Sequence, residues 1–211
     1  MNDEIDVGGS VQGTIVMSPT PSSASPLPRP CVTDAQAVHE LVEKGFGWTD
    51  RQNDGGDGGA DARLFLESFE ALYLMHTDRL TLFRSKRLLT FEAFLSMCRR
   101  HDPDVLTRFL IYRDLRSRGY VAKDGFGFGA DFRVYERGHF GQKGSKILIF
   151  GLVEGRPEKM VHLQKKIREI TKMGKEPIMA VVDRHGEIIY YRIGTVEFRE
   201  NKGRVLQDLL R

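Results

Sequence analysis

The chain lacks the sequence features of a membrane-spanning protein, a secreted protein or a metal-binding protein. None of its 211 residues belongs to a run of about 18 apolar residues, the length that a membrane-spanning helix needs. Its first residues, MNDEIDVGG, are acidic and lack the apolar segment of a secretory signal. Only two cysteines are present, Cys31 and Cys98, and no Cys-x-x-Cys spacing occurs. These absences predict an intracellular, cytoplasmic protein with free thiols and no bound metal or cofactor.

Positive charge is unevenly distributed, although the net charge is only +3. One group lies near a predicted basic helix and comprises Lys159, Lys165, Lys166, Arg168, Lys172 and Lys175. A second group precedes it and comprises Arg113, Arg116, Arg118, Lys123, Arg133 and Arg137. A localised basic surface is expected where a protein binds a phosphate backbone. A solvated helix face explains any one lysine better, so only the two groups together indicate a nucleic-acid partner.

The N-terminal part reads as a small sheet with helices. Residues 10–17 fit a strand, and the Pro/Ser-rich stretch 18–30 predicts an extended surface loop without regular structure. Thr33 and Asp34 supply an N-cap for a helix that stops at Gly45. The acidic, glycine-rich stretch 53–59 predicts a linker, because the ligand spacing of a calcium-binding loop is absent.

A second group of elements leads towards the middle of the chain. Residues 62–75 predict a short strand followed by an amphipathic helix, and residues 78–84 a strand or turn. Thr90 caps another helix. The next helix, 104–118, is expected to bridge two domains, with the boundary near its start.

The segment YRDLRSRGYVAKDGFGFGADFRVY, residues 112–135, is the most informative one. A helix pattern stops at Gly119, a strand covers 120–123, and a glycine-rich turn leads to a strand that ends at Tyr135. Further on, KILIFGLVEG from Lys146 predicts a strand, 165–175 a basic helix, and 177–193 a hairpin.

These motifs resemble the C-terminal catalytic domain of the tRNA-splicing endonucleases, best known from archaea. The shared features are a helix ending in RGY, a glycine-containing turn, FG-x-DF-x-VY, and a lysine before the apolar strand MAVVD. Weaker likeness in LVEKGFGW and FLESFEALYL extends the resemblance over roughly residues 32 to 198. It implies an α+β fold: a small N-terminal α/β domain, 32–106, then a nuclease-like C-terminal domain, 107–200, with a mixed sheet flanked by helices. Residues 1–31 would form an N-terminal strand and loop, and 201–211 a tail.

The resemblance also implies a chemistry. The family cleaves RNA without a metal, leaving a 2′,3′-cyclic phosphate and a 5′-hydroxyl. The attacking 2′-hydroxyl needs a base, the leaving 5′-oxygen an acid, and the phosphorane a cation. The likeness assigns the base to Tyr135 and the cation to Lys175. Without it, Tyr135 reads as a packed strand-end residue and Lys175 as a cation complementing a helix dipole.

The family histidine, expected roughly ten residues after the tyrosine, is missing because Gly144 stands in its place. The nearby imidazole is His139, in a glycine-rich loop that is flexible enough to bring it inward; a solvated loop residue is the other reading. Two hypotheses therefore stand. The chain is a catalytic subunit of a tRNA-intron endonuclease that cuts at bulge–helix–bulge junctions, or it is a non-catalytic structural subunit of the same enzyme. A third hypothesis is a general RNA-binding protein on this fold.

The resemblance implies two binding roles as well. Arg168 would stack on a flipped-out bulge base of the precursor tRNA; its alternative is an ion pair with Glu169 or Glu158. Asp183 and Glu187 would form an acidic loop that docks into an identical or homologous endonuclease subunit; their alternative is an ordinary acidic β-turn.

Overall fold

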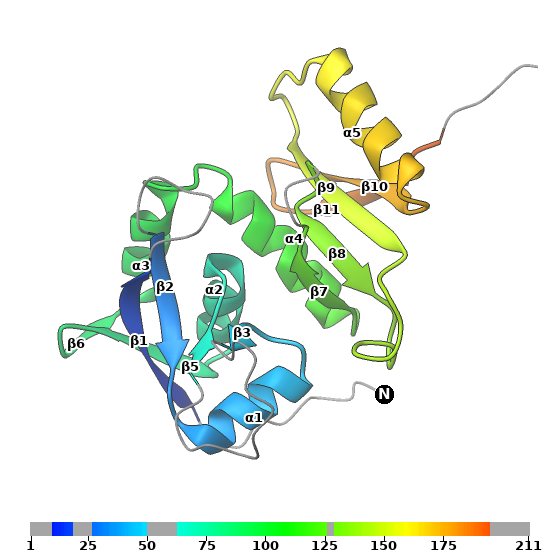
Figure 1. The fold of residues 1–211 in the computed structure, drawn as a ribbon. Helices are drawn as coiled ribbons and strands as arrows, with labels where there is room; N and C mark the ends of the chain where they lie inside the picture. The colour runs from blue at the N-terminus through cyan, green and yellow to red at the C-terminus, as the bar shows by residue number, and fades with distance from the viewer. Residues whose placement is uncertain (1–9, 19–26, 50–62, 126–128, 195–211) are drawn as a thin grey trace, which may run out of the picture.

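Two β-sheets, one from each half of the chain, meet at the central helix α4 (Val105–Ser117) (Figure 1). The structure is a computed structural model, and it describes residues 10–18, 27–49, 63–125 and 129–194. Its helices and two mixed sheets make the fold α+β, which confirms the predicted class.

The N-terminal sheet has the strand order β3-β4-β2-β1-β5-β6. Its strands are β1 (Val11–Ser18), β2 (Leu27–Val32), β3 (Trp48–Thr49), β4 (Leu64–Phe65), β5 (Leu80–Arg84) and β6 (Arg87–Leu89). Only β1 and β5 pair in parallel. The helices of this half are α1 (Ala35–Glu43), α2 (Ser68–His76) and α3 (Phe91–Arg99).

Strand β2 corrects one expectation, because residues 27–30 were predicted to lack regular structure. Pro28 and Pro30 lie in β2, paired with β1 in an antiparallel ladder. The carbonyl of Pro30 accepts a hydrogen bond from Leu66, on the side away from β1, at 2.9 Å. The missing N–H of Pro30 therefore also faces away from β1, so the ladder loses no hydrogen bond there. The neighbouring residues 19–26 and the predicted linker 53–59 lie outside the described residues.

The predicted helix caps are present. The side chain of Asp34 accepts a hydrogen bond from the Ala37 N–H at 2.8 Å, and Thr90 accepts one from Ala93 at 3.3 Å. These bonds satisfy N–H groups that the first helical turn leaves without a backbone partner. The starts of α1 and α3 were thus predictable from single residues.

Three helices end in the same way, at a glycine with positive φ. Gly45, Gly119 and Gly174 have φ of +76°, +81° and +67°. The residue after each glycine donates its N–H to the carbonyl five positions before it: Phe46 to Leu41, Tyr120 to Leu115 and Lys175 to Ile170. This is the Schellman arrangement, and it fixes the direction in which the chain leaves the helix.

The C-terminal sheet has the order β11-β10-β9-β8-β7. Its strands are β7 (Val121–Asp124), β8 (Phe132–Tyr135), β9 (Ile147–Val153), β10 (Glu176–Val182) and β11 (Ile188–Arg192). Strands β9 and β10 are parallel, joined through α5 (Met160–Lys172), and the other pairs are antiparallel. Helix α4 covers one face, over Ile149 and Ala180, and α5 covers the other, over Leu148 and Phe150. The expected mixed sheet flanked by helices is therefore present.

Helix α5 differs from its predicted range. It begins at Met160 rather than Lys165 and ends at Lys172, so Lys175 is not helical. Leu163, Ile167 and Ile170 lie on the face that packs on the sheet. Met160 lies a turn before Leu163, and its side chain is exposed, which hid the start of the helix from the apolar pattern.

The two halves share one hydrophobic core around α4, as expected for a bridging helix. Phe69 of α2 lies 5.0 Å from Tyr112 of α4 and 5.1 Å from Phe132 of β8, measured between ring centroids. Beside this cluster, the buried carboxylate of Glu70 accepts a hydrogen bond from the ammonium of Lys123, on β7, at 3.1 Å. An apolar contact and an ion pair thus both cross between the halves.

Candidate active site

The candidate site lies at the edge of the C-terminal sheet where β8 ends and where β9 and β10 begin. Val134 pairs with Ile147, and Ile147 pairs with Glu176. One residue beyond these pairs, the register brings Tyr135, Lys146 and Lys175 into a single row across three strands. The Glu176 N–H donates to the Lys146 carbonyl at 2.8 Å, so the β9–β10 pairing continues to this edge. Paired strands lie about 5 Å apart, so the register places these three residues at neighbouring positions.

The members of this row share one face of the sheet. Val134 is buried in the core beneath α4, so Tyr135, the next residue, points to the opposite face. Lys146 lies two residues before Leu148, which packs under α5 on that opposite face. Lys175 lies opposite Lys146 in the parallel register and therefore shares its face. Tyr135 and Lys175 are half-buried and Lys146 is exposed, so all three side chains are at least partly accessible on this face of the sheet.

Lys175 is held at both ends. Its backbone N–H closes the Schellman arrangement of α5 with Ile170 at 3.2 Å. Its ammonium donates a hydrogen bond to the carbonyl of the buried residue Ser145. A Cβ atom added to Gly144 would lie 4.0 Å from this ammonium. Gly144, where the resemblance leads us to expect a histidine, is therefore the neighbour of the candidate catalytic cation.

The loop after β8 contacts Tyr135 through Phe140. The two rings meet edge to face with their centroids 5.2 Å apart. His139 instead lies 3.3 Å from the carboxylate of Glu136, measured from Nδ1 to Oε2. Within the described residues, no hydrogen bond or ring contact joins His139 to Tyr135 or Lys175. The sequence-predicted tyrosine and lysine therefore share a row, and the predicted histidine lies outside it.

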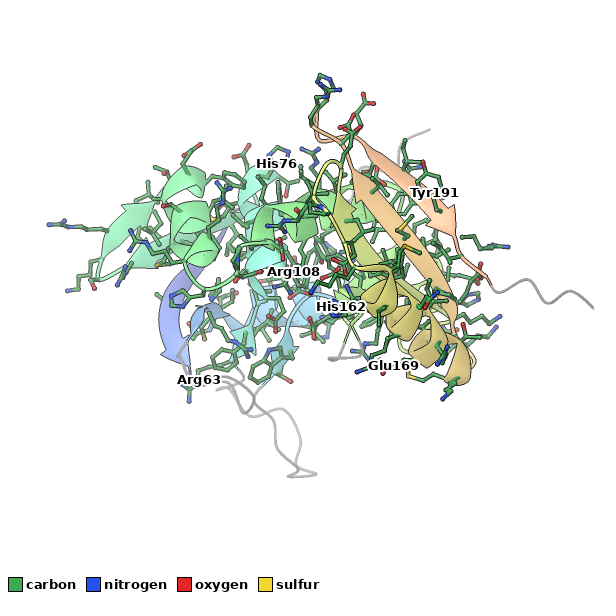
Figure 2. All side chains as sticks on the ribbon, turned by 90° about the horizontal axis from the view of Figure 1, so that it is seen from above. Arg63, His76, Arg108, His162, Glu169 and Tyr191 are labelled. Atoms are coloured by element: carbon green, nitrogen blue, oxygen red, sulfur yellow. The ribbon has the colours of Figure 1, made fainter. Side chains whose placement is uncertain are left out.

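Arg168 is exposed on α5, which lies over the outer face of the C-terminal sheet and carries the labelled Glu169 (Figure 2). The two carboxylates that the sequence offered as its partners are taken by other residues. Glu169 lies 3.9 Å from Lys165, and Glu158 lies 3.8 Å from Lys166. Across the ranges that the structure describes, Arg168 makes no ion pair within 4.0 Å, so its guanidinium is available to a ligand.

Asp183 shapes the turn between β10 and β11. Its carboxylate accepts hydrogen bonds from the N–H groups of Glu187 and His185, both at 2.8 Å. These bonds, with that from Glu187 first, lower the pKa of Asp183. Gly186 has φ +81°, a value that the turn requires and that glycine adopts without strain. Asp183 thus organises the turn, and Glu187 is its exposed carboxylate.

The second group of basic residues largely supports the fold. Lys123 pairs with Glu70, and Arg116 lies 4.1 Å from the centroid of the Phe46 ring. Arg116 also donates to the backbone carbonyl of Lys44, and two other members donate to backbone carbonyls: Arg133 to Asp124 and Arg137 to Arg118. The exposed charge expected from the sequence is therefore concentrated on α5.

No three His, Cys, Asp or Glu side chains gather as a possible metal site within the described ranges. Among the same residues, no helix is long and apolar enough to cross a membrane.

Comparison with known proteins identifies the family. Residues 105–190 match the family described as tRNA intron endonuclease, catalytic C-terminal domain, and residues 29–95 match its N-terminal domain. A tRNA-splicing endonuclease of Thermococcus gammatolerans is 34% identical over 138 residues, which cover 65% of this chain and 81% of that protein. The chain belongs to the tRNA-splicing endonuclease family.

Methanogen members of the family are equally similar. The tRNA-splicing endonuclease of Methanococcus maripaludis is 34% identical over 132 residues, 62% of this chain and 75% of that protein. That of Methanothermobacter thermautotrophicus is 34% identical over 132 residues, 62% of this chain and 76% of that protein. The candidate row lies within the region that matches the catalytic domain of the family.

Proposed function

We propose that the chain is a subunit of a tRNA-intron endonuclease that cleaves precursor tRNA at bulge–helix–bulge junctions. The single observation that carries this proposal is the row of Tyr135, Lys146 and Lys175 inside a domain of the endonuclease family. The products are a 2′,3′-cyclic phosphate and a 5′-hydroxyl, formed without a metal.

The row supplies a base and a cation for this reaction. Tyr135 takes the proton from the 2′-hydroxyl; the new 2′-oxygen–phosphorus bond forms and the bond to the 5′-oxygen breaks. Lys175 stabilises the phosphorane, which carries more negative charge than the ground state. Lys146, which sequence reasoning missed, lies between them in the row and adds a second positive charge on the face where the phosphate would bind. The position of Lys146 in the row follows only from the register of the strands, which a single sequence does not reveal.

The general acid is His139, whose loop packs on Tyr135 through Phe140. It delivers a proton to the leaving 5′-oxygen after a loop movement that releases it from Glu136. The glycines of this loop, Gly138 and Gly141, have φ of +72° and +79° and leave a Cβ atom no neighbours within 4 Å. The loop is therefore not clamped at these positions.

A second candidate function rests on Gly144. Because the place beside Lys175 carries no imidazole, the chain fits a structural subunit that binds RNA and a catalytic partner. In both functions Arg168 contacts the bulge, and the turn of Asp183 and Glu187 docks into an identical or homologous subunit. In both, residues 32–106 form the N-terminal domain and residues 107–200 the endonuclease domain, between the terminal segments 1–31 and 201–211.

One experiment tests the proposal and separates the two functions. The purified chain is incubated in EDTA with an intron-containing precursor tRNA, alone and together with a catalytic family member. Cleavage by the chain alone, reduced at least tenfold by Tyr135→Phe with RNA binding unchanged, supports the catalytic function. Tyr191→Phe, a change on the exposed strand β11, is the matched control. Cleavage that requires the second subunit and ignores Tyr135→Phe supports the structural function, and binding without cleavage in any mixture contradicts both.

A further inference from the structure

A cluster of unpaired cations lies on the N-terminal half, at the tip of the β5–β6 hairpin and the end of α3. We call it the hairpin patch; its members are Arg84, Lys86, Arg87, Arg99 and Arg100, and all five are exposed. In Figure 1, β6 stands at the opposite end of the molecule from β8 and α5, so the patch is remote from the candidate active site.

A hairpin turn and one side-chain contact define the geometry of the patch. Ser85 and Lys86 have φ of +48° and +66°, and Arg84 pairs with Arg87 across this two-residue turn. Two left-handed residues at a hairpin tip give a turn whose twist matches that of its strands. The guanidinium of Arg84 lies 3.5 Å from the sulfur of Met97, in the second half of α3. This contact joins the hairpin to the last turn of α3, which is followed by Arg100.

Nothing in the described parts of the chain neutralises this charge: none of the five cations has a carboxylate within 4.0 Å. The helix dipole accounts for Arg99 in the last turn of α3, but not for three cations on a hairpin. The contrast is with Lys123 and Arg118, which the fold pairs with acids. Five exposed and unpaired cations in a chain of net charge +3 form a field that favours a polyanion.

We infer that the hairpin patch binds the phosphate backbone of an RNA double helix, in the body of the precursor away from the cut. This rests on the proposed function, because it names a second contact with the same substrate. Sites for single strands stack bases on aromatic side chains, and residues 84–89 contain none. Phosphate contacts by Arg and Lys position a nucleic acid without reading its sequence, so the patch would hold a precursor whatever the sequence of its tRNA body.

The test compares two RNAs and two variants. The double variant Lys86→Asn/Arg87→Gln removes two patch charges, and asparagine tolerates the positive φ of position 86. The control Arg118→Gln/Arg156→Gln removes two exposed arginines that are paired with Asp114 and Asp104. The RNAs are a full precursor tRNA and a short bulge–helix–bulge duplex without the tRNA body. Dissociation constants are measured between 50 and 300 mM salt.

For the full precursor, the patch variant is expected to bind about tenfold more weakly, with a log–log salt slope reduced by about 2, one for each lost phosphate contact. The patch variant is expected to bind the short duplex with the wild-type dissociation constant. The control variant is expected to bind both RNAs with wild-type dissociation constants. Equal loss for both RNAs, or no loss for the precursor, overturns the inference while leaving the proposed function intact. A wild-type chain that binds neither RNA overturns the proposed function and the inference with it.

Discussion

The ammonium of Lys175 lies 4.0 Å from the point that a Cβ atom on Gly144 would occupy. Among the residues that the structure describes, and apart from the chain neighbours of Gly144, no other heavy atom lies within 4 Å of that point. The backbone of Gly144 is outside the left-handed region, so a larger residue fits without strain. A side chain at position 144 would therefore reach the candidate catalytic cation. The importance of a histidine at this position can therefore be tested by substituting Gly144.

His139→Ala is expected to slow cleavage by the chain 10²- to 10⁴-fold, the usual contribution of a general acid. The fall in rate at high pH that comes from deprotonation of this acid should disappear with it. Single-turnover rates across pH measure both effects, with His162→Ala, an exposed change on α5, as the control. An unchanged rate and profile in the full complex would retire His139 and favour the structural function.

Gly144→His is expected to restore at least tenfold of the rate lost in the His139→Ala background. The new imidazole would stand beside Lys175 and supply the proton that the variant lacks, and its limb should lie near the ordinary histidine pKa of about 6.5. Gly144→Asn has similar size and no titrating group, so it serves as the control. Equal rates for the two substitutions would argue against a competent Tyr135–Lys175 site.

Lys175→Ala is expected to reduce the cleavage rate far more than RNA affinity, because a cation aimed at the phosphorane acts mainly in the transition state. Lys172→Ala removes an exposed charge from the nearby end of α5 and should change only affinity, by a small and salt-sensitive amount. Single-turnover rates and dissociation constants separate the two effects. A Lys175→Ala variant that resembles Lys172→Ala would reduce Lys175 to a backbone-anchoring role through Ser145.

The double variant Asp183→Ala/Glu187→Ala is expected to lower the assembly mass without unfolding the chain. Glu187→Ala alone should weaken assembly and keep the turn, because the hydrogen bonds of the turn belong to the Asp183 carboxylate. Sedimentation measures the mass, and circular dichroism the fold, with Arg184→Ala on the same turn as the control. Assembly at the wild-type mass would contradict a docking role for this turn.

Asp131→Asn is expected to change how stability depends on pH. Burial raises the pKa of Asp131, although a hydrogen bond from Gly151 at 2.6 Å opposes the shift. The folded chain then binds this proton more tightly than the unfolded chain. The wild-type free energy of unfolding therefore falls as pH rises from the ordinary Asp pKa of about 3.9 towards the raised value.

In Asp131→Asn this position does not titrate, so the fall in the free energy of unfolding between the ordinary and the raised Asp131 pKa should be absent. The variant should therefore gain stability relative to wild type as pH rises through this range, and it should keep the gain at neutral pH. Urea unfolding between pH 3 and pH 7 measures the difference. Glu92→Gln, on the exposed face of α3, should show no comparable gain. A wild-type chain that grows more stable relative to Asp131→Asn over the window would contradict the raised pKa.

Much of the fold follows from local signals in the sequence. Asp34, Thr90 and Gly119 mark helix ends because their effects act within one turn of the chain. Pro30 misled the prediction, since a proline is tolerated in a strand when its nitrogen faces away from the partner. That direction depends on which strand pairs with β2 and in which register. Neither can be read from the proline itself.

The candidate site was predictable only in part. Tyr135 and Lys175 follow from family motifs, but Lys146 enters through the register of β8, β9 and β10. The ion pair of Lys123 with Glu70 could not be predicted either, because Glu70 lies in the other half of the chain. Register and long-range pairing are properties of the folded sheet, so a linear pattern of charges cannot separate a binding surface from a structural ion pair.

The aromatic cluster of Phe69, Tyr112 and Phe132 has a consequence for chains that are broken in two. A cut between α3 and α4 would leave Phe69 on one fragment and its two partner rings on the other. Each fragment alone would expose a large apolar surface and an uncompensated charge, Glu70 on the first and Lys123 on the second. Two separately made polypeptides would therefore aggregate singly and regain a native fold only on mixing, so fragment complementation, rather than independent domains, is the behaviour that this architecture dictates.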